Sequence, residues 1–409
     1  MRHTSHPSFA VVVFQLGGPD SLDAVEPFLY NLFSDPDIID FPFARLARPT
    51  LARLISSRRA RHVQAHYAAI GGKSPIRELT ERQARALECE LQKSIVARVF
   101  VAMRYWHPLT EEAVKEIARG DFRQLVLLPL YPQYSKTTTG SSLNEWQRQY
   151  ARAGIDSLRM TVVQSFYDHP TYIDALVEKI NEGLARFNAP GGAGARHGAP
   201  LRPADDVHLV FSAHGVPVRV IEQGDPYQKQ IEETVRLVVE RGGWRNPHVL
   251  CYQSRVNPGK WLEPSLRDTL CRLAAQHPEE VAKELPEAEG GPTPRRKDSK
   301  PAQSTEKDHP AGLRALAPWR EAAGSSNSSI PVDAVHSSAS GDAGSGTPRV
   351  LVIPISFVTD HVETLAEIDI EARALAAQLG IAQFELMPAL NDSPTFIRAL
   401  AELVLARLG

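Results

Sequence analysis

Eight short runs of apolar, mostly β-branched residues recur along the chain, and longer amphipathic stretches lie between them. Runs that are apolar throughout, rather than at every second position, are typical of strands buried on both faces of a parallel sheet. The intervening stretches, such as residues 110–119 and 226–240, repeat apolar residues at helical spacing. The eight predicted strands lie at residues 9–16, 96–103, 124–130, 158–164, 207–212, 248–252, 349–357 and 384–387.

The alternation of strands and helices predicts an α/β fold built from right-handed βαβ units. Eight strands divide into four and four, so we expect two similar Rossmann-like domains, each with a four-stranded parallel sheet flanked by helices. The first is expected at residues 1–150 and the second at residues 151–409, with the last helix packed back on the N-terminal half. Ligands of such sheets bind in the crevice at the carboxyl ends of the strands, so the residues that follow each strand are the candidates for function.

Two low-complexity segments interrupt the pattern. Residues 188–205 are rich in glycine, alanine and proline, and residues 291–347 are rich in glycine, proline and serine without sustained periodicity. A segment of that composition buries too little apolar surface to offset the entropy lost on ordering. We therefore expect a disordered insertion at residues 286–347, in a surface loop before the seventh strand.

The composition argues against several classes of protein. A formal net charge of −2 disfavours a general nucleic-acid binder, which needs a basic excess. The three cysteines, Cys89, Cys251 and Cys271, form no CxxC motif, which disfavours a disulfide framework, a zinc knuckle and a cysteine-bound iron–sulfur cluster. No run reaches the roughly 18 apolar residues of a membrane span, and the first residues lack signal-peptide features. We therefore expect a cytoplasmic protein.

Glycines and tyrosines follow two of the predicted strands. Gly17 and Gly18 come after the first strand, where paired glycines allow a ligand to approach the backbone closely, but the G-x-G-x-x-G fingerprint of dinucleotide sites is absent. Tyr131 and Tyr134 come after the third strand, before the hydroxyl-rich residues 137–142. This aromatic and hydroxyl-bearing surface suits a large planar ligand. The alternatives are an ordinary strand–helix turn and an N-cap cluster.

A histidine and three glutamates follow strands of the second half. His214 follows the fifth strand; a neutral imidazole binds borderline metals such as Fe(II), although a lone histidine is more often structural. Glu363, Glu367 and Glu371 follow the seventh strand at i, i+4 and i+8, so a regular helix places them on one face, as a charged path or as a solvated surface. An imidazole and a carboxylate in one cleft form a weak, open metal site, which suits delivery of a metal better than storage.

Several stretches of the chain match one protein family. They are QLGGPDSLDAVEPFLYNLFSDPDIIDFP at residues 15–42, YAAIGGKSPIRELTERQA at 67–84, MRYWHPLTEEA at 103–113, LPLYPQYSKTTTGSS at 128–142, FSAHGVPVRVIEQGDPY at 211–227, YQSRVNPGKWLEP at 252–264, IPISFVTDHVETLAEIDIE at 353–371 and PALNDSPTFI at 388–397. On these stretches the chain closely resembles the ferrochelatases, lyases that insert ferrous iron into a porphyrin to make haem. The matches cover nearly the whole chain outside the two low-complexity segments.

The resemblance implies a porphyrin cleft between the two halves and assigns roles to particular residues. His214 and Glu363 would be the catalytic and metal-binding pair, with the histidine as proton acceptor or metal ligand. Glu367 and Glu371 would extend a path for protons or metal from Glu363, and His361 would lie next to the pair. The substrate-binding residues would be Arg59 with its neighbour Arg58, Tyr67, Ser74, Arg104 and Tyr131.

The resemblance also implies substrates and partners. Porphyrin and ferrous iron would be the substrates, with protoporphyrin IX favoured and protohaem as the product, and with no permanently bound cofactor, no iron–sulfur cluster and no nucleic-acid partner. A monomer or homodimer and peripheral contact with a membrane both stay open. Lys73 stands where the family's GGGSP motif commonly has its third glycine, and Lys136 lies within the QYSxxTTG motif.

Other functions fit parts of the pattern. One alternative is specificity for coproporphyrin, and another is a related chelatase that places cobalt or nickel in a sirohydrochlorin-type ring. A two-lobed periplasmic-type binding protein shares the two-half architecture, and a degenerate chelatase could serve as a haem-binding scaffold. The lack of signal-peptide features and the intact SAHG and DHVET motifs disfavour these last two.

Overall fold

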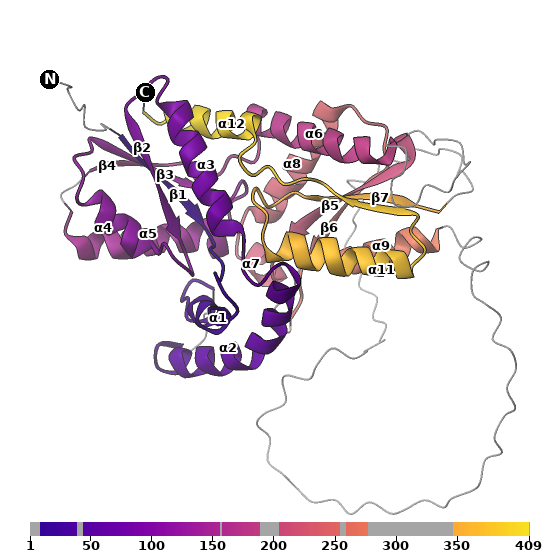
Figure 1. Cartoon of the computed structure of the whole chain (residues 1–409), viewed down its shortest axis with the longest axis horizontal. Helices are drawn as coiled ribbons and strands as arrows, with labels where there is room; N and C mark the ends of the chain where they lie inside the picture. Colours follow the sequence, from indigo (N-terminus) through magenta and orange to yellow (C-terminus); the bar gives the residue numbers. More distant parts are fainter. Residues whose placement is uncertain are drawn as a thin grey trace, which may run out of the picture.

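Two four-stranded parallel sheets form the framework of the protein (Figure 1). The computed structural model describes residues 9–38, 44–155, 158–188, 204–253, 259–276 and 347–408. The strand orders are β2-β1-β3-β4 and β6-β5-β7-β8, and every neighbouring pair is parallel. The strands are β1 at Phe9–Gln15, β2 at Ala97–Met103, β3 at Gln124–Pro129, β4 at Arg159–Val162, β5 at Val207–His214, β6 at His248–Gln253, β7 at Arg349–Pro354 and β8 at Gln383–Leu386. The predicted fold class is confirmed.

The first sheet extends past the domain boundary expected at residue 150. β4 is hydrogen-bonded to the edge of β3 that β1 does not occupy, with Arg159 opposite Gln124. β4 therefore belongs to the first sheet. Residues 286–346 of the expected insertion, and residues 189–203 of the other low-complexity segment, lie outside the described residues.

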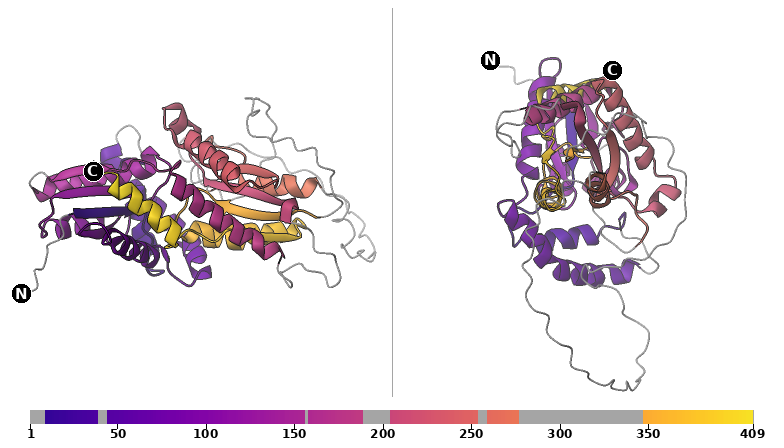
Figure 2. Two further views of the ribbon diagram at one scale, coloured as in Figure 1. Left: turned by 90° about the horizontal axis from the view of Figure 1, so that it is seen from above. Right: turned by 90° about the vertical axis from the view of Figure 1, so that its right-hand side faces the viewer.

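Helices cover both faces of each sheet (Figures 1 and 2). They are α1 at Val25–Phe33, α2 at Ala44–Ala69, α3 at Ile76–Leu91, α4 at Thr110–Ile117, α5 at Ser141–Ala153, α6 at Pro170–Ala185, α7 at Val218–Glu222, α8 at Tyr227–Gly242, α9 at Leu266–Ala275, α11 at Arg373–Gln378 and α12 at Pro394–Leu405. Two stretches, η1 at Lys136–Gly140 and η4 at Glu363–Ala372, are π-helices, and η2 at Arg186–Asn188 and η3 at Ala204–Asp206 are short 3₁₀ turns.

Alternation along the strands explains why both faces are covered. Successive side chains of a strand point to opposite faces of the sheet. In β1, Val11 and Val13 belong to one apolar cluster, and Val12 and Phe14 belong to another, which also contains Trp146 of α5. All four of these β1 side chains are at most 1% exposed, as a parallel sheet with helices on both sides requires.

One apolar cluster extends through both halves. It contains Val11 and Val13 of β1, Leu351 and Ile353 of β7, and Phe396 of α12. α12 packs against α3 of the first half and against α6. Because separating the halves would expose this shared layer to water, burial of apolar surface holds them in one arrangement.

α1 and α2 pack on each other at the carboxyl ends of the first sheet's strands, below the sheets in Figure 1. α2 also contacts η4 of the second half, so it lies over the segment that carries the three predicted glutamates. No helix in the described part of the chain combines the length and apolar character needed to cross a bilayer.

Substitution of Phe396 tests how much the shared apolar layer contributes to stability. Its side chain is fully buried, with its ring centroid 6.5 Å from that of Phe166 and 6.3 Å from that of Tyr172 on α6. Phe396→Ala is expected to lower the free energy of unfolding by about 3–5 kcal/mol, because it removes buried surface and leaves a cavity. Chemical denaturation measures the loss. Leu54→Ala, at a position that is 45% exposed, is the control and is expected to change it by less than about 0.5 kcal/mol. Equal effects of the two substitutions would contradict the prediction.

Candidate active site

His214 and Glu363 meet where two neighbouring strands end. His214 is the last residue of β5, and Glu363 begins η4, the first helix after β7. Because β5 and β7 are adjacent and parallel, their carboxyl ends lie at the same edge of the sheet. The Nδ1 of His214 lies 2.9 Å from the Oε2 of Glu363, and the two side chains are 33% and 16% exposed. The structure thus brings together the two residues predicted as the catalytic pair.

Three further side chains position the pair by hydrogen bonds. The backbone N–H of His214 donates to the Oγ of Ser356 at 2.9 Å, and the hydroxyl of Tyr227 donates to the carbonyl of His214 at 3.1 Å. The amide Nε2 of Gln253 donates to the Oε2 of Glu363 at 3.4 Å. The backbone of the histidine and the carboxylate of the glutamate are therefore held separately, which fixes the distance between the two side chains.

Contact with the carboxylate sets the protonation behaviour of His214. Burial alone would lower its pKa, but the charge and hydrogen bond of Glu363, with a further contribution from Glu367, raise the pKa above its ordinary value of 6.5. A carboxylate oxygen accepts, so the Nδ1 of His214 carries the hydrogen. In the neutral imidazole the lone pair then lies on Nε2, the nitrogen that can accept a proton or bind a metal.

His361 lies beside the pair and stays neutral. Its Nδ1 donates to the carbonyl of Thr359 at 3.0 Å, and its ring centroid is 4.4 Å from that of Phe357, which in turn contacts the ring of His214. Burial lowers its pKa more than the nearby carboxylates, Glu363 first among them, raise it. Because a carbonyl can only accept, the lone pair of this imidazole also lies on Nε2.

The three glutamates form a line that leads outward along η4. Glu363 and Glu367 are half-buried, and Glu371 is 55% exposed. The sequence suggested a regular helix here, whereas Glu363–Ala372 is a π-helix, whose hydrogen bonds run from i to i+5 and whose turn is wider. Helical segments of this kind are frequent at functional sites.

α2 provides a guanidinium and a hydrogen-bonding imidazole to this line. His66 places its Nε2 3.0 Å from the Oε1 of Glu371. Burial lowers the pKa of Arg59, and the carboxylate of Glu367 opposes that shift, so the guanidinium lies within range of Glu367. Burial raises the pKa of Tyr67, which is 2% exposed, and the carboxylates of the line raise it further. Two of the predicted substrate-binding residues therefore lie close to the glutamates.

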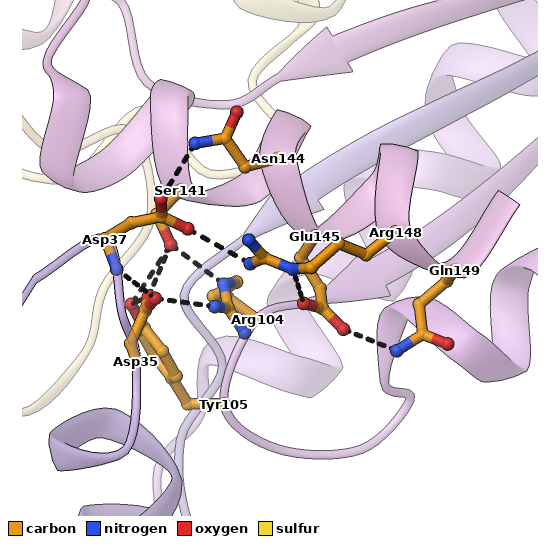
Figure 3. Close-up of polar contacts among 9 residues, drawn as sticks. All are labelled: Asp35, Asp37, Arg104, Tyr105, Ser141, Asn144, Glu145, Arg148 and Gln149. Carbon is orange, nitrogen blue, oxygen red and sulfur yellow. Dashed lines mark hydrogen bonds and ion pairs between the residues drawn. The ribbon is translucent and has the colours of Figure 1, made fainter. Parts of the chain in front are cut away.

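Arg104 belongs to a buried polar network at the end of β2 (Figure 3). Its Nη2 lies 2.9 Å from the Oδ1 of Asp35, and its Nε donates to the Oγ of Ser141 at 2.8 Å. The hydroxyls of Tyr105 and Ser141 both donate to the Oδ2 of Asp35, at 2.6 and 2.5 Å. Burial would raise the pKa of Asp35, but Arg104 and these hydroxyls outweigh it and lower the pKa. The positive charge of Arg104 is thus balanced by the carboxylate of Asp35.

The same network continues to the surface of α5 (Figure 3). Asp37 accepts from the Nη2 of Arg148 at 3.0 Å and from the Nδ2 of Asn144 at 2.9 Å. Arg148 in turn donates to Glu145 at 2.8 Å. The segment after α1 is therefore tied to α5 by charged contacts at two points.

The remaining predicted substrate residues lie at the ends of β1 and β3. Tyr131 is half-buried, and burial raises its pKa although Ser142 and Arg104 oppose the shift. Ser74 is 5% exposed and packs against the turn after β1, where a Cβ on Gly18 would come within 2.6 Å of its side chain. Its hydroxyl accepts from the N–H of Ile76 at 3.4 Å, at the start of α3. The porphyrin contacts assigned to these residues stay predictions.

Sequence reasoning missed three residues of the site. Gln253 ends β6, so the strand-end rule that selected His214 could have found it. Asp35 follows a helix rather than a strand, and His66 lies inside a helix, so that rule does not reach them. In the described residues, no group of three or more His, Cys, Asp or Glu side chains is arranged to hold a metal ion. The pair itself offers one imidazole nitrogen and one carboxylate as donors.

Comparison with known proteins assigns the family. The family model described as Ferrochelatase matches residues 8–283 and 334–408. A ferrochelatase from Geotalea daltonii is 42% identical over 395 residues, covering 97% of this chain and 96% of that protein. One from Thermosynechococcus vestitus is 40% identical over 397 residues, covering 96% of this chain and 81% of that protein. Among solved structures, SirB from Bacillus subtilis with Fe3+ matches 98% of this chain and 95% of that chain with a TM-score of 0.46 and 9% identity. The family match and the two relatives show that the chain belongs to the ferrochelatase family.

Proposed function

We propose that this protein inserts Fe(II) into protoporphyrin IX, forming protohaem, as a lyase of haem biosynthesis. The observation that carries the proposal is the contact between the Nδ1 of His214 and the Oε2 of Glu363 at the carboxyl ends of β5 and β7. An imidazole can accept a proton and a carboxylate can bind a metal ion, and insertion of a metal into a porphyrin needs a group of each kind. Family membership supports the same reaction.

The pair is suited to remove a pyrrole proton. Glu363 engages the Nδ1–H of His214, so the lone pair of the imidazole is on Nε2. A proton accepted at Nε2 produces an imidazolium next to a carboxylate, and this favourable pairing is the reason that the pKa of His214 is raised. Glu363 thus makes His214 a stronger base while its negative charge also attracts the incoming cation.

The line of glutamates connects this pair with the surface. Exposure increases from Glu363 at 16% to Glu371 at 55%, so ions and protons can exchange with water at the outer end. Adjacent carboxylates at i and i+4 repel one another, and a passing cation or proton relieves this repulsion. The guanidinium of Arg59 on α2 limits this repulsion. We propose that Glu367 and Glu371 form the path along which the second proton leaves or the metal arrives.

We propose that the reaction needs no permanently bound cofactor. An iron–sulfur cluster of the kind held by cysteines takes four of them, and the chain has 3. Arg59, Tyr67, Ser74, Arg104 and Tyr131 are proposed to contact the porphyrin. We further propose that the protein acts in the cytoplasm, with coproporphyrin as the competing substrate to be tested beside protoporphyrin.

Removal of the imidazole tests the function directly. The purified protein is expected to insert Fe(II) into protoporphyrin IX under anaerobic conditions, and His214→Ala is expected to lower this rate by about 10²–10⁴-fold, the contribution of a well-placed base. Absorbance of the porphyrin follows the reaction, and fluorescence quenching measures porphyrin binding, which should persist in the variant.

His107→Ala is the matched control. His107 contacts Glu112 at 2.8 Å with the same pair of groups, but at the surface, where the two side chains are 51% and 49% exposed. Its loss should leave the rate unchanged. A wild-type protein that inserts iron only into coproporphyrin would reassign the substrate, and one that inserts it into neither porphyrin would reject the proposed function.

The order of the carboxylates gives the second test. Glu363→Gln is expected to slow insertion by about 10²-fold or more, because this carboxylate contacts the base, whereas Glu367→Gln should slow it by only about 10-fold. Initial rates at saturating iron and porphyrin measure both. Asp369→Asn, on the same π-helix but paired with Arg373 at 2.6 Å, is the control. A larger loss of rate from Glu367→Gln than from Glu363→Gln would contradict the proposed order of the carboxylates along the path.

The acid limb of the pH profile reports the charge of His214. Only the neutral imidazole can accept a proton, so kcat/KM for the porphyrin should rise with pH through a pKa above 6.5. Glu363→Gln removes the negative charge that raises this pKa, so the acid limb of that variant should move to lower pH even though its maximum rate falls. An acid limb at the same pH in both proteins would show that His214 does not accept the proton.

A further inference from the structure

Gln83 of α3, in the first half, holds the loop that leads to the site residues of the second half. Its side chain is 1% exposed. The amide Nε2 donates to the carbonyl of Asn391 at 2.9 Å and to that of Val358 at 3.4 Å, and the amide oxygen accepts from the hydroxyl of Thr359 at 3.1 Å. One buried side chain thus uses both its donor and its acceptor across the boundary between the halves.

Thr359 also receives a contact from the first sheet. The Nε2 of Gln15, the last residue of β1, donates to the hydroxyl of Thr359 at 3.4 Å. Gln15 is 6% exposed and Thr359 is 2% exposed, so water has little access to these groups. A buried polar group that loses its partner carries a desolvation penalty, and this penalty keeps the contacts closed.

Thr359 is hydrogen-bonded to His361, which lies beside the catalytic pair proposed above. Its carbonyl accepts from the Nδ1 of His361 at 3.0 Å. The neighbouring Asp360 is held by Asn391, whose Oδ1 accepts from the N–H of Asp360 at 3.1 Å and whose Nδ2 donates to its carboxylate at 2.9 Å. Asn391 has a φ of 41°, a left-handed conformation that asparagine tolerates better than most residues. η4 begins at Glu363, directly after this segment.

We infer that Gln83 is a positioning residue for the reaction. Through Thr359 it sets where His361 and Glu363 lie relative to the groups of α2 in the first half, Tyr67 among them. The inference rests on the proposed function. The substrate has to fit between groups from both halves, so a buried contact that registers one half against the other, within a few residues of Glu363, controls the geometry of the reacting groups.

Gln83→Met keeps the length and bulk of the side chain and removes its hydrogen bonds. We expect kcat for iron insertion to fall by about 10-fold or more, the size of effect seen when groups that orient metal ligands are lost. KM for the porphyrin should stay within about two-fold, because the change misplaces reacting groups rather than the ring. In a Glu363→Gln background, Gln83→Met should cause little further loss, because its effect acts through Glu363.

Gln124→Met is the matched control. Gln124 is also a buried glutamine of the first half, 5% exposed, whose Nε2 donates to a carbonyl of the C-terminal segment, that of Arg407, at 3.0 Å. It lies at the start of β3, at the opposite end of the sheet from the site. Its loss should affect stability without changing kcat. Losses from Gln83→Met and Glu363→Gln that multiply independently would overturn the inference.

Hydrogen exchange separates this inference from the proposed function, because it uses the protein without substrate. Gln83→Met should speed exchange of the amides of Asp360 and His361, and Gln124→Met should not. Wild-type exchange there in Gln83→Met would overturn the positioning role, even in a protein shown to insert no iron. If Gln83→Met does not fold, Thr359→Val decides, because it keeps the shape of the side chain and removes the hydroxyl that donates to the amide oxygen of Gln83. Faster exchange and lower kcat in that variant support the inference, and wild-type values of both reject it.

Discussion

The hydrogen bond between His214 and Glu363 depends on the parallel pairing of β5 and β7. The register of that pair runs from Val207 opposite Arg349 to Ser212 opposite Pro354, so both strands reach the same edge together. A slip of one residue would turn His214 toward the other face of the sheet. The apolar residues that fill both faces of these strands prevent such a slip, so the burial of the sheet determines the chemistry at its edge.

Burial and charge act in opposite directions at this edge, and their balance gives the site its character. Removal from water destabilises the imidazolium, whereas Glu363 stabilises it, and the carboxylate prevails. A similar opposition recurs along η4, where burial lowers the pKa of Arg59 on α2 and the carboxylate of Glu367 opposes that shift. The guanidinium that α2 supplies therefore reduces the repulsion along the line of glutamates.

Patterns along the sequence were sufficient to predict the strands and to place His214 and Glu363 at the ends of neighbouring strands. Buried parallel strands are apolar throughout, and the ends of such strands are where side chains converge, so His214 and Glu363 could be selected without coordinates. The contact of Gln83 with Thr359 spans 276 residues of chain, and neither residue lies in a strand. Pairing of this kind follows from tertiary packing, which local patterns do not encode. The π-helix is a similar case, because the spacing of its glutamates is also compatible with an α-helix.

The two halves repeat one sheet order, but the site is not symmetric. The first half supplies α1, α2 and the buried Asp35–Arg104 ion pair, and the second half supplies the histidine and the glutamates. If the junction between the halves were mobile, the distance between the groups of α2 and the histidine and glutamates of the second half would not be fixed. The shared apolar layer that includes Phe396 limits large movements, but such contacts are not directional. Hydrogen bonds are directional, so the polar contacts of Gln83 and Gln15 with Thr359 fix the register that the apolar layer leaves loose.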